Sequence, residues 1–196
     1  VLIDYDTRVE KVIINDLNEL RRVYLKHQND IWIGYNSRMY DQFILKGIIH
    51  GLDASWVNEK LIVEGIPGWR VHSCMNQYKL NNFDVSTGFH SLKQLEGFMG
   101  ESIKETSVPF SIKRKLTEDE IEETVQYCRH DVQQTIKVFE ATKGEFEAQL
   151  ALIDAFNLSP NMFNKTKAQL SAHILGCNKV LRDDEFDITI VDTLRL

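Results

Sequence analysis

The chain has 196 residues, of which 43% are hydrophobic and 27% are charged, and its formal net charge is −6 at pH 7. This length and composition fit one ordinary globular domain with a modest extension, which is enough to bury a core. The negative charge argues against a protein that binds nucleic acid mainly through basic residues, as a histone does. It is compatible with an enzyme that holds phosphates through metal ions, because carboxylates around a metal site add negative charge themselves.

The cysteines predict neither disulfides nor a structural zinc site. Cys74, Cys128 and Cys177 are odd in number, far apart and not accompanied by a C-x-x-C pair or a closely spaced cluster of histidine and cysteine. The sequence has no apolar run long enough to span a bilayer, and its first residues lack the basic region of a secretory signal. We therefore expect a soluble cytoplasmic protein without membrane contact.

Both ends of the sequence indicate a fragment of a longer protein. The chain begins without Met, inside an apolar run, and residues 187–192 near the other end alternate like a strand that no turn closes. No internal repeat or low-complexity tract divides the chain.

In chain order, the first predicted elements are a hairpin and a helix. Val1–Ile3 and Val9–Ile14 are apolar, β-branched runs separated by a turn-forming stretch that contains two aspartates, which predicts a hairpin. Asp16 is placed to cap a helix over residues 16–27, and Glu19 completes the pattern of a capping box.

Strand and helix patterns continue to alternate along the rest of the chain. Residues 31–34 predict a buried strand, and residues 39–50 predict an amphipathic helix. The later predicted elements are a strand ending over residues 82–85 and helices over residues 91–99, 117–142, 148–156 and 165–175. This alternation predicts an α/β fold with a mixed sheet.

The long predicted helix, residues 117–142, has one apolar face. Its apolar residues recur at steps of three and four and form a stripe that we expect to dock on the sheet: Ile121, Val125, Cys128, Val132, Ile136 and Phe139. Tyr127 and Asp131 are four residues apart and stack beside this stripe. Taken alone, such a pair is usually a half-buried tyrosine and a solvated charge.

A second stretch, residues 32–48, gives that pair a context. A buried strand is followed by a Gly-Tyr-Asn turn and then by Asp41 in the first turn of a helix. Considered alone, Asp41 is a first-turn carboxylate that the helix dipole stabilises and that takes no part in chemistry. Gly34 permits a close approach of the backbone, and Asn36 can offer an amide to a ligand at the carboxyl end of the strand, where open α/β sheets usually bind ligands.

These two stretches resemble a known enzyme family. The "GYN" of residues 34–36, with "YD" at 40–41 and "IL" at 44–45, resembles the second motif of the DEDD (DnaQ-like, ribonuclease H-like) 3′–5′ exonucleases. The "YCRHDV" of residues 127–132 resembles their third motif in its tyrosine form, which identifies the DEDDy branch. The histidine form requires a histidine where this chain has Gln126. The 90-residue spacing from Asp41 to Asp131 also fits the family.

The resemblance implies a ribonuclease H-like mixed sheet flanked by helices over residues 1–145, and a reaction that uses two Mg²⁺ or Mn²⁺ ions. By resemblance, Asp131 binds one metal directly, Asp41 helps to hold the other, and Tyr127 orients the attacking water. Such hard cations prefer carboxylate oxygens. Residues 146–196 are then a helical extension and the start of a further module.

The first motif of the family, Asp-x-Glu on the opening strand, has only one candidate here, the sequence Asp4-Tyr5-Asp6. An aspartate stands where the glutamate belongs. The favoured alternative is that these residues form the turn of a later hairpin. Only nine residues separate Asp6 from the helix start at Asp16, which is too few for the two further strands that the family's sheet normally has between its first strand and its first helix. In that alternative the first strand lies upstream of Val1 and the site in this fragment is incomplete. If Asp4 and Asp6 are instead the first motif, they complete the site.

Two further features are candidates for contacts with nucleic acid. The basic run 113–115 can contact a phosphate backbone, although a solvated loop is the favoured alternative. The loop aromatics Phe89, Phe110 and Trp69 can stack on a terminal base, although packing is the more common role of such residues and none of the three is assigned.

The resulting hypothesis is an exonuclease of phage or prophage type that acts on the 3′ ends of single-stranded DNA. It would work in replication or repair, with a DNA polymerase domain in the same chain or complex. One alternative is an RNA 3′-end exonuclease of the ribonuclease D kind, which has the same motifs. The other is a catalytically silent module that binds nucleic acid and retains the fold.

Overall fold

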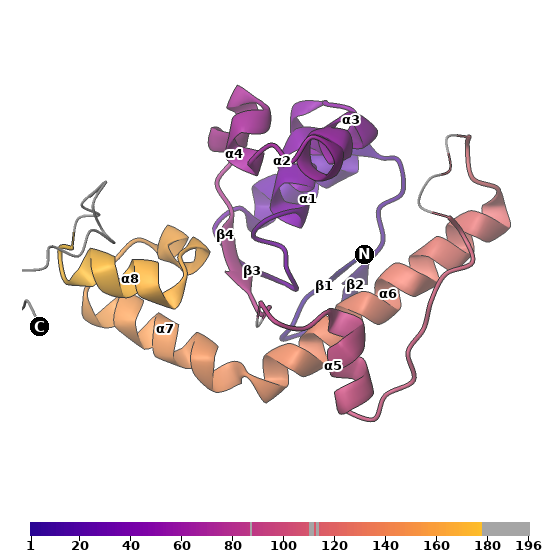
Figure 1. Cartoon of the computed structure of the whole chain (residues 1–196). Helices are drawn as coiled ribbons and strands as arrows, with labels where there is room; N and C mark the ends of the chain where they lie inside the picture. Colours follow the sequence, from indigo (N-terminus) through magenta and orange to yellow (C-terminus); the bar gives the residue numbers. More distant parts are fainter. Residues whose placement is uncertain (87, 110–111, 113, 178–196) are drawn as a thin grey trace, which may run out of the picture.

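The computed structural model describes residues 1–86, 88–109, 112 and 114–177 (Figure 1). Helices α1 to α4 gather on one side of the molecule, the long helix α6 runs along the other, and strands β3 and β4 lie between them. The elements in chain order are β1 (Leu2–Ile3), β2 (Glu10–Lys11), α1 (Leu17–His27), β3 (Ile31–Gly34), α2 (Asp41–His50), α3 (Ala54–Asn58), the π-helix η1 (Glu59–Val63), α4 (Gly68–Val71), the 3₁₀ helix η2 (Ser73–Asn76), β4 (Asn81–Asp84), α5 (Leu92–Phe98), α6 (Glu118–Ala141), α7 (Lys143–Ala155), the 3₁₀ helix η3 (Pro160–Asn164) and α8 (Lys167–Ile174).

The α/β class predicted from the sequence is confirmed. β1 and β2 pair antiparallel, with Leu2 opposite Lys11, and β3 and β4 pair in parallel, with Gly34 opposite Asp84. The described strands form two separate sheets of two strands each, and one continuous mixed sheet is not seen among them. The hairpin strands are only two residues long, which is too short to bury a broad sheet face.

The predicted hairpin is confirmed, and the aspartate at its turn explains its geometry. The Asp4 N–H donates to the Val9 carbonyl at 2.9 Å, and the Arg8 N–H donates back to the Asp4 carbonyl at 2.9 Å. The Asp4 carboxylate accepts hydrogen bonds from the N–H and the hydroxyl of Thr7 at 2.7 and 2.8 Å. These hydrogen bonds lower the pKa of Asp4. The side chain of Asp4 is therefore engaged in forming its own turn.

Three predicted helix starts are confirmed by their caps. Asp16 accepts the N–H of Glu19, and Ser91 and Thr117 each close a complete capping box with the residue three positions later. The capping box predicted at Asp16 is not formed, because the Glu19 carboxylate pairs instead with Lys11 and Arg22. The N-terminus of α1 is thus capped by the Asp16 side chain alone, and the Glu19 carboxylate links the helix to the hairpin through Lys11.

The main core is an aromatic cluster that packs against β4. The Phe83 ring centroid lies 5.2 Å from that of Phe146 and 6.2 Å from those of Phe139 and Phe163, all in edge-to-face arrangements. Val85, Val138 and Ile153 complete the buried part of the cluster, and Phe146 packs against it half-buried. Edge-to-face aromatic pairs add stabilisation beyond the burial of area. α6, α7 and η3 are held to the sheet through these rings.

The apolar stripe predicted for α6 docks only at its C-terminal end. Of the six predicted residues, Phe139 is buried and the other five are half-buried. The positions buried elsewhere on the helix include the polar residues His130 and Gln134. The physical reason is that a sheet of two strands is too narrow to cover a helix of 24 residues.

The free edge of β4 is covered by a side chain. Asn164 in η3 accepts the Asn82 N–H at 3.2 Å and donates to the Leu80 carbonyl at 2.6 Å. Its side-chain amide therefore accepts and donates the two backbone hydrogen bonds that one residue of a neighbouring strand would make. An exposed strand edge invites pairing with other chains, and this contact satisfies it.

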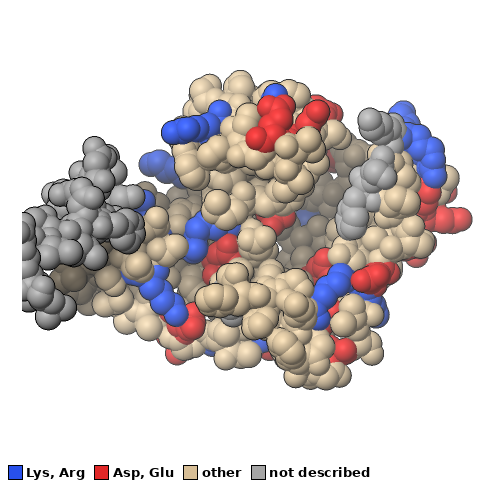
Figure 2. Space-filling model, in the orientation of Figure 1, with Lys and Arg blue, Asp and Glu red and all other residues tan. Residues whose placement is uncertain are grey.

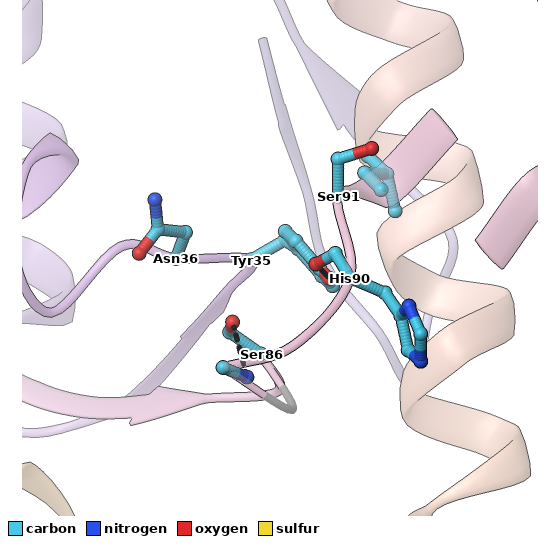
Figure 3. Close-up of a pocket in the computed structure, with 7 residues that line it drawn as sticks. Tyr35, Asn36, Ser86, His90 and Ser91 are labelled. Carbon is cyan, nitrogen blue, oxygen red and sulfur yellow. Dashed lines mark hydrogen bonds between the residues drawn. The ribbon is translucent and has the colours of Figure 1, made fainter. Parts of the chain in front are cut away.

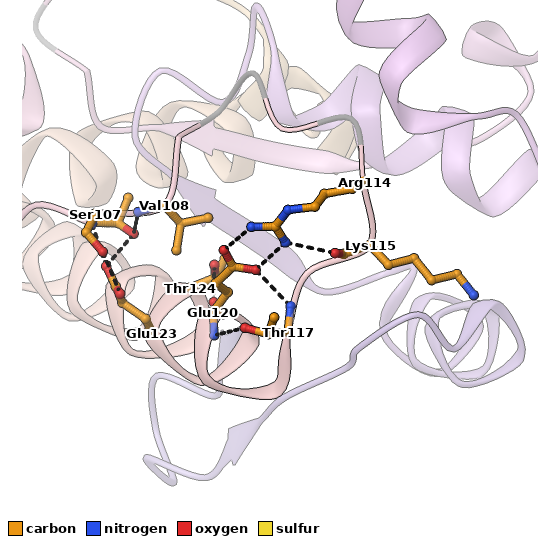
Figure 4. A network of polar contacts seen from close by, with 9 residues as sticks. Ser107, Val108, Arg114, Lys115, Thr117, Glu120, Glu123 and Thr124 are labelled. Atoms are coloured by element: carbon orange, nitrogen blue, oxygen red, sulfur yellow. Dashed lines mark hydrogen bonds and ion pairs between the residues drawn. The ribbon is translucent and has the colours of Figure 1, made fainter.

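The segment before α6 is tied down by acidic residues of that helix (Figure 4). Arg114 donates to both carboxylate oxygens of Glu120 at 2.6 and 2.7 Å, and this pairing lowers the pKa of Glu120 to about 2. Glu123 accepts hydrogen bonds from Thr106 and Ser107. The charge of Arg114 is thus already paired, which favours the loop alternative for the basic run 113–115. Lys113 lies outside the described residues.

The predicted helices after α6 are confirmed with shifted boundaries, as α7 and α8. α7 begins at Lys143 rather than at residue 148. The predicted strand over residues 187–192 lies outside the described residues. Within the described part of the chain, no helix has both the length and the apolar character needed to cross a bilayer.

We expect Phe163→Ala to destabilise the fold strongly. Phe163 is 1% exposed and contacts both Phe83 and Phe146, so its removal leaves a cavity that costs about 3–5 kcal/mol of unfolding free energy. Phe156→Ala is the matched control, because Phe156 is 53% exposed and its loss should change stability by less than about 0.5 kcal/mol. Urea unfolding followed by circular dichroism measures both. Equal losses in the two variants would contradict the assignment of this core.

Candidate functional site

The parallel pairing of β3 and β4 places the ends of both strands at one edge. Asp84, the last residue of β4, lies opposite Gly34, the last residue of β3. Its carboxylate accepts the N–H of Arg38 at 2.9 Å and the N–H of Ser86 at 3.0 Å. Asp84 therefore holds together the two loops that leave the strands. No local feature of the sequence marks Asp84 as a site residue, because its position depends on the pairing of two strands that are far apart in the sequence.

Asp41 joins Asp84 at this edge. It begins α2, where the preceding residue, Tyr40, provides no side-chain cap. The Asp41 side chain is exposed to solvent, yet surrounding protein raises its pKa, and the charge of Asp84 raises it further. A cation beside these two neighbouring carboxylates would offset the repulsion between their charges.

Tyr127 and Asp131 form a hydrogen-bonded pair on α6. Burial, the charge of Asp131 and the hydrogen bond between the two side chains raise the pKa of Tyr127 to about 12. The phenol therefore stays protonated at neutral pH and donates to the carboxylate. Burial raises the pKa of Asp131, while Tyr127 and the charge of Lys93 lower it. Asp131 Oδ1 is buried and has no hydrogen-bond partner among the described residues.

Helix α5 supplies further charged groups beside this pair. The Lys93 ammonium lies 4.9 Å from the centre of the Tyr127 ring. Glu96 is fully buried, and its Oε2 atom lies 3.3 Å from His130 Nε2. Glu96 Oε1 has no hydrogen-bond partner in the described part of the chain. Sequence reasoning missed Glu96, because an acidic residue in a short helix gives no signal of burial.

A pocket of about 330 Å³ lies between the strand ends and the start of α5 (Figure 3). Asn36 lines it and has a left-handed backbone with φ of 52°, a conformation that asparagine tolerates better than most residues. The Tyr35 hydroxyl donates to the His90 carbonyl across the pocket. The pocket is lined by Tyr35, Asn36, Ser86, Gly88, His90, Ser91 and Leu92.

Gly34 permits a close approach, as the sequence suggested, and the group that approaches belongs to the chain itself. A β-carbon at this position would lie 2.6 Å from the Ser37 β-carbon, which is a severe overlap. The space is thus filled by Ser37, whose hydroxyl donates to Asn82 at 3.0 Å. The missing side chain allows the turn to fold back onto the strand, and it does not leave room for a ligand.

The predicted site residues fall into two groups on different elements. Asp41 and Asn36 lie at the strand ends with Asp84, whereas Tyr127 and Asp131 lie on α6. The charge that acts on Asp41 is that of Asp84, and the charges that act on Asp131 include those of Lys93, Glu96 and His130. The pocket is lined by the loops after β3 and β4 and by the beginning of α5, the helix whose Lys93 and Glu96 act on Asp131.

Asp4 and Asp6 do not join either group in the way that a first motif requires. Asp4 and Asp6 are exposed, and the Asp4 carboxylate binds Thr7 within its own turn. The hairpin itself contacts α6 elsewhere, through the Arg129–Glu10 pair and the Arg8–Glu140 pair. The alternative of a hairpin turn for these residues is the one that the structure favours.

The carboxylates of both groups suit hard divalent cations. Asp41, Asp84 and Asp131 offer carboxylate oxygens, which Mg²⁺ and Mn²⁺ prefer. The buried, unpartnered Oδ1 atom of Asp131 is costly unless something satisfies it, and a coordinated cation would do so. On the described part of the face shown in Figure 2, acidic and basic side chains are interspersed and no broad area carries one sign.

The pKa of Tyr127 provides a direct test of the pair. In Asp131→Asn we expect this pKa to fall from about 12 and to remain above the ordinary value of 10.0. It falls because a phenolate no longer faces a carboxylate, and it stays raised because burial is the largest cause. Carbon-13 NMR of labelled tyrosine measures it, with Tyr127→Phe to assign the resonance. An unchanged pKa in Asp131→Asn would show that the two groups do not interact.

Comparisons of the chain with protein-family models, with curated proteins and with solved structures give no significant match. The choice of a function therefore depends on the chemistry and geometry of the residues described above.

Proposed function

We propose that this chain is a metal-dependent 3′–5′ exonuclease of the DEDDy kind, which hydrolyses phosphodiesters at the 3′ ends of single-stranded DNA. The observation that carries the proposal is the hydrogen-bonded pair of Tyr127 and Asp131, with one carboxylate atom buried and unpartnered. A ribonuclease H-like core over residues 1–145 and association with a phage-type DNA polymerase are part of the same proposal.

Asp41, Asp84 and Asp131 would hold the divalent ions. When bound, two such ions activate water and stabilise the leaving 3′ oxygen. Asp84 also fixes the positions of both loops through its hydrogen bonds to Arg38 and Ser86. The raised pKa of Asp41 means that a cation and a proton compete for this carboxylate. Metal binding should therefore weaken as the pH falls.

Tyr127 orients the attacking water rather than deprotonating it. A phenol with a pKa of about 12 is a poor base near neutral pH but a good positioned hydrogen-bonding group. Its hydrogen bond to Asp131 fixes the direction of the hydroxyl. Lys93, beside the Tyr127 ring, adds a positive charge on the side where a phosphate would lie.

The pocket at the strand ends suits a flexible single strand. Asn36 offers an exposed amide at its edge. Phe89 follows the pocket residue Gly88 and is 89% exposed. An aromatic ring so exposed does not contribute to the core, and aromatic rings bind unpaired bases by stacking. These features favour a terminal nucleotide that has left a duplex.

A second candidate, a silent module that binds nucleic acid, is favoured by one observation. Asp4 and Asp6 lie in a hairpin turn, so these residues do not supply the first-motif carboxylates that catalysis in the family uses. Such a module would bind single strands through the pocket and would cleave nothing. Turnover separates the two candidates.

The catalytic proposal predicts that the chain degrades a 5′-labelled single-stranded DNA from its 3′ end in the presence of Mn²⁺. We expect Asp131→Asn to reduce this rate on the order of 100-fold or more, because loss of even an indirect metal partner costs 10–100-fold. Asp154→Asn, an exposed aspartate of α7, is the matched control and should keep the full rate. Product ladders on denaturing gels measure all three.

Each other outcome of this assay has a definite meaning. Binding of the DNA without degradation would favour the silent module. Faster degradation of the matched RNA oligonucleotide would favour the ribonuclease D alternative. Equal activity in Asp131→Asn and the unaltered chain would contradict the assigned site.

We also expect Phe89→Ala to weaken binding of single-stranded DNA. Stacking of one base on an aromatic ring contributes about 1–3 kcal/mol, so the dissociation constant should rise roughly 5- to 150-fold. Fluorescence anisotropy with Ca²⁺ in place of Mn²⁺ measures binding without cleavage. Phe156→Ala, which also removes an exposed ring, should bind as the unaltered chain does. A similar loss in both variants would exclude a specific role for Phe89.

A further inference from the structure

A second group of metal-binding side chains lies at the other end of α2. His50 is the last residue of this helix, and His72 and Cys74 belong to the segment that enters η2. One ligand atom from each of the three residues lies within 4.8 Å of the others. His72 and Cys74 are close in sequence, but His50 joins them only because α2 packs on η2. The fold is thus what creates this group.

The three side chains select a different class of metal from the carboxylates. Imidazole and thiolate ligands suit Zn²⁺ and related transition metals, whereas Mg²⁺ and Mn²⁺ prefer oxygen. In a tetrahedral zinc site the Zn–S bond is about 2.3 Å and the Zn–N bonds are about 2.0–2.1 Å, which places the ligand atoms roughly 3.5 Å apart. Coordination therefore requires the ligand atoms, now within 4.8 Å, to move together by about an ångström.

The three side chains of the group differ in their exposure to solvent. Cys74 is fully buried in a cluster with Phe43, Val57 and Met75, whereas His50 is exposed. A buried thiolate is a firm ligand, and an exposed histidine leaves one side open to water. This arrangement gives three protein ligands and an open fourth position.

The hydrogen bonds of the two histidines already orient their rings. His72 Nδ1 accepts the Cys74 N–H at 3.2 Å, and His50 Nδ1 lies 3.3 Å from the Tyr78 hydroxyl oxygen. When His50 donates to Tyr78 through Nδ1, its Nε2 lone pair is free to bind an ion, and such outer partners commonly fix the ring of a metal ligand. If the ion binds His72 through Nδ1, the lone pair that now accepts the Cys74 N–H binds the metal instead, and one long hydrogen bond is lost.

Lys46 is the charge that a bound cation would face. It is 9% exposed and acts electrostatically on Cys74. Its ammonium donates to the Gln42 side-chain oxygen at 3.1 Å and lies 5.4 Å from the centre of the Phe43 ring, so Lys46 has partners of its own in the cluster that surrounds the thiol.

We propose that His50, His72 and Cys74 form a binding site for Zn²⁺ or a similar transition metal ion, with water as the fourth ligand. The site would fasten the end of α2 to η2. It is separate from the carboxylates of the candidate exonuclease site, because Asp41 and His50 are at opposite ends of α2, about 14 Å apart at 1.5 Å per residue. We expected no structural zinc, because we found neither a C-x-x-C pair nor a closely spaced cluster of histidine and cysteine. That expectation did not consider His50, which the fold brings to His72 and Cys74.

Titration of the reduced, metal-free chain with Co²⁺ tests the proposal. A thiolate ligand gives an intense charge-transfer band in the near ultraviolet, and a tetrahedral site gives strong visible bands, both of which Zn²⁺ should abolish by displacement. We expect Cys74→Ser to lose the charge-transfer band and His50→Gln to bind Co²⁺ at least 10-fold more weakly. His50→Gln alters an exposed side chain, so it preserves the test if Cys74→Ser fails to fold.

Matched controls exclude binding at other residues. Cys177→Ser and His173→Gln alter a second cysteine and a second histidine outside the group and should bind Co²⁺ as the unaltered chain does. At a hundredfold excess over its dissociation constant, Zn²⁺ should also raise the unfolding midpoint by roughly 5–10 °C. No charge-transfer band in the folded chain, or a band that is lost only in Cys177→Ser, would overturn the proposal. Neither result depends on nuclease activity, so this site and the exonuclease site can fail independently.

Discussion

The parallel pairing of β3 with β4 is the constraint on which the candidate site depends. It is only four residues long, so the pairing itself supplies little stability. It is held from both faces, by the aromatic cluster around Phe83 and by the cluster that Tyr24, Ile49 and Leu80 form under α1 and α2. Asn164 closes its free edge. Because parallel strands end at the same edge, this pairing brings the loop before Asp41 next to Asp84, and no shorter-range feature of the chain would do so.

The second requirement is that α6 crosses near this edge with polar residues buried. Helix α6 is anchored at its C-terminal end by Val138 and Phe139, while its middle buries His130 against Glu96. Buried carboxylates with unpartnered oxygen atoms cost free energy and do not improve packing. Groups of this kind concentrate at functional sites, where the cost is tolerated for chemistry. The position of Asp131 among them is therefore more informative than its match to a short motif.

The sequence predicted the local features well and the assembled ones poorly, for physical reasons. Asp16, Ser91 and Thr117 were found because a cap is a contact within three residues. Asp84 was missed because it matters only when β4 pairs with β3. Likewise, His50 reaches Cys74 only through the packing of α2 on η2. The stripe of α6 was overestimated because periodicity reveals which face is apolar but not how much of that face a narrow sheet can cover.

The carboxylates that are present set a condition on the proposed reaction. Asp41, Asp84 and Asp131 together with one phosphodiester balance the charge of two divalent ions, whereas the three aspartates alone do not. With Asp4 occupied in its own turn, the second ion in the proposed enzyme would be held firmly only when the substrate phosphate is present. Binding of metal and of DNA would then reinforce each other, as linkage requires of two ligands that stabilise one another. A site of this kind favours catalysis on a bound 3′ end and keeps little metal in its absence.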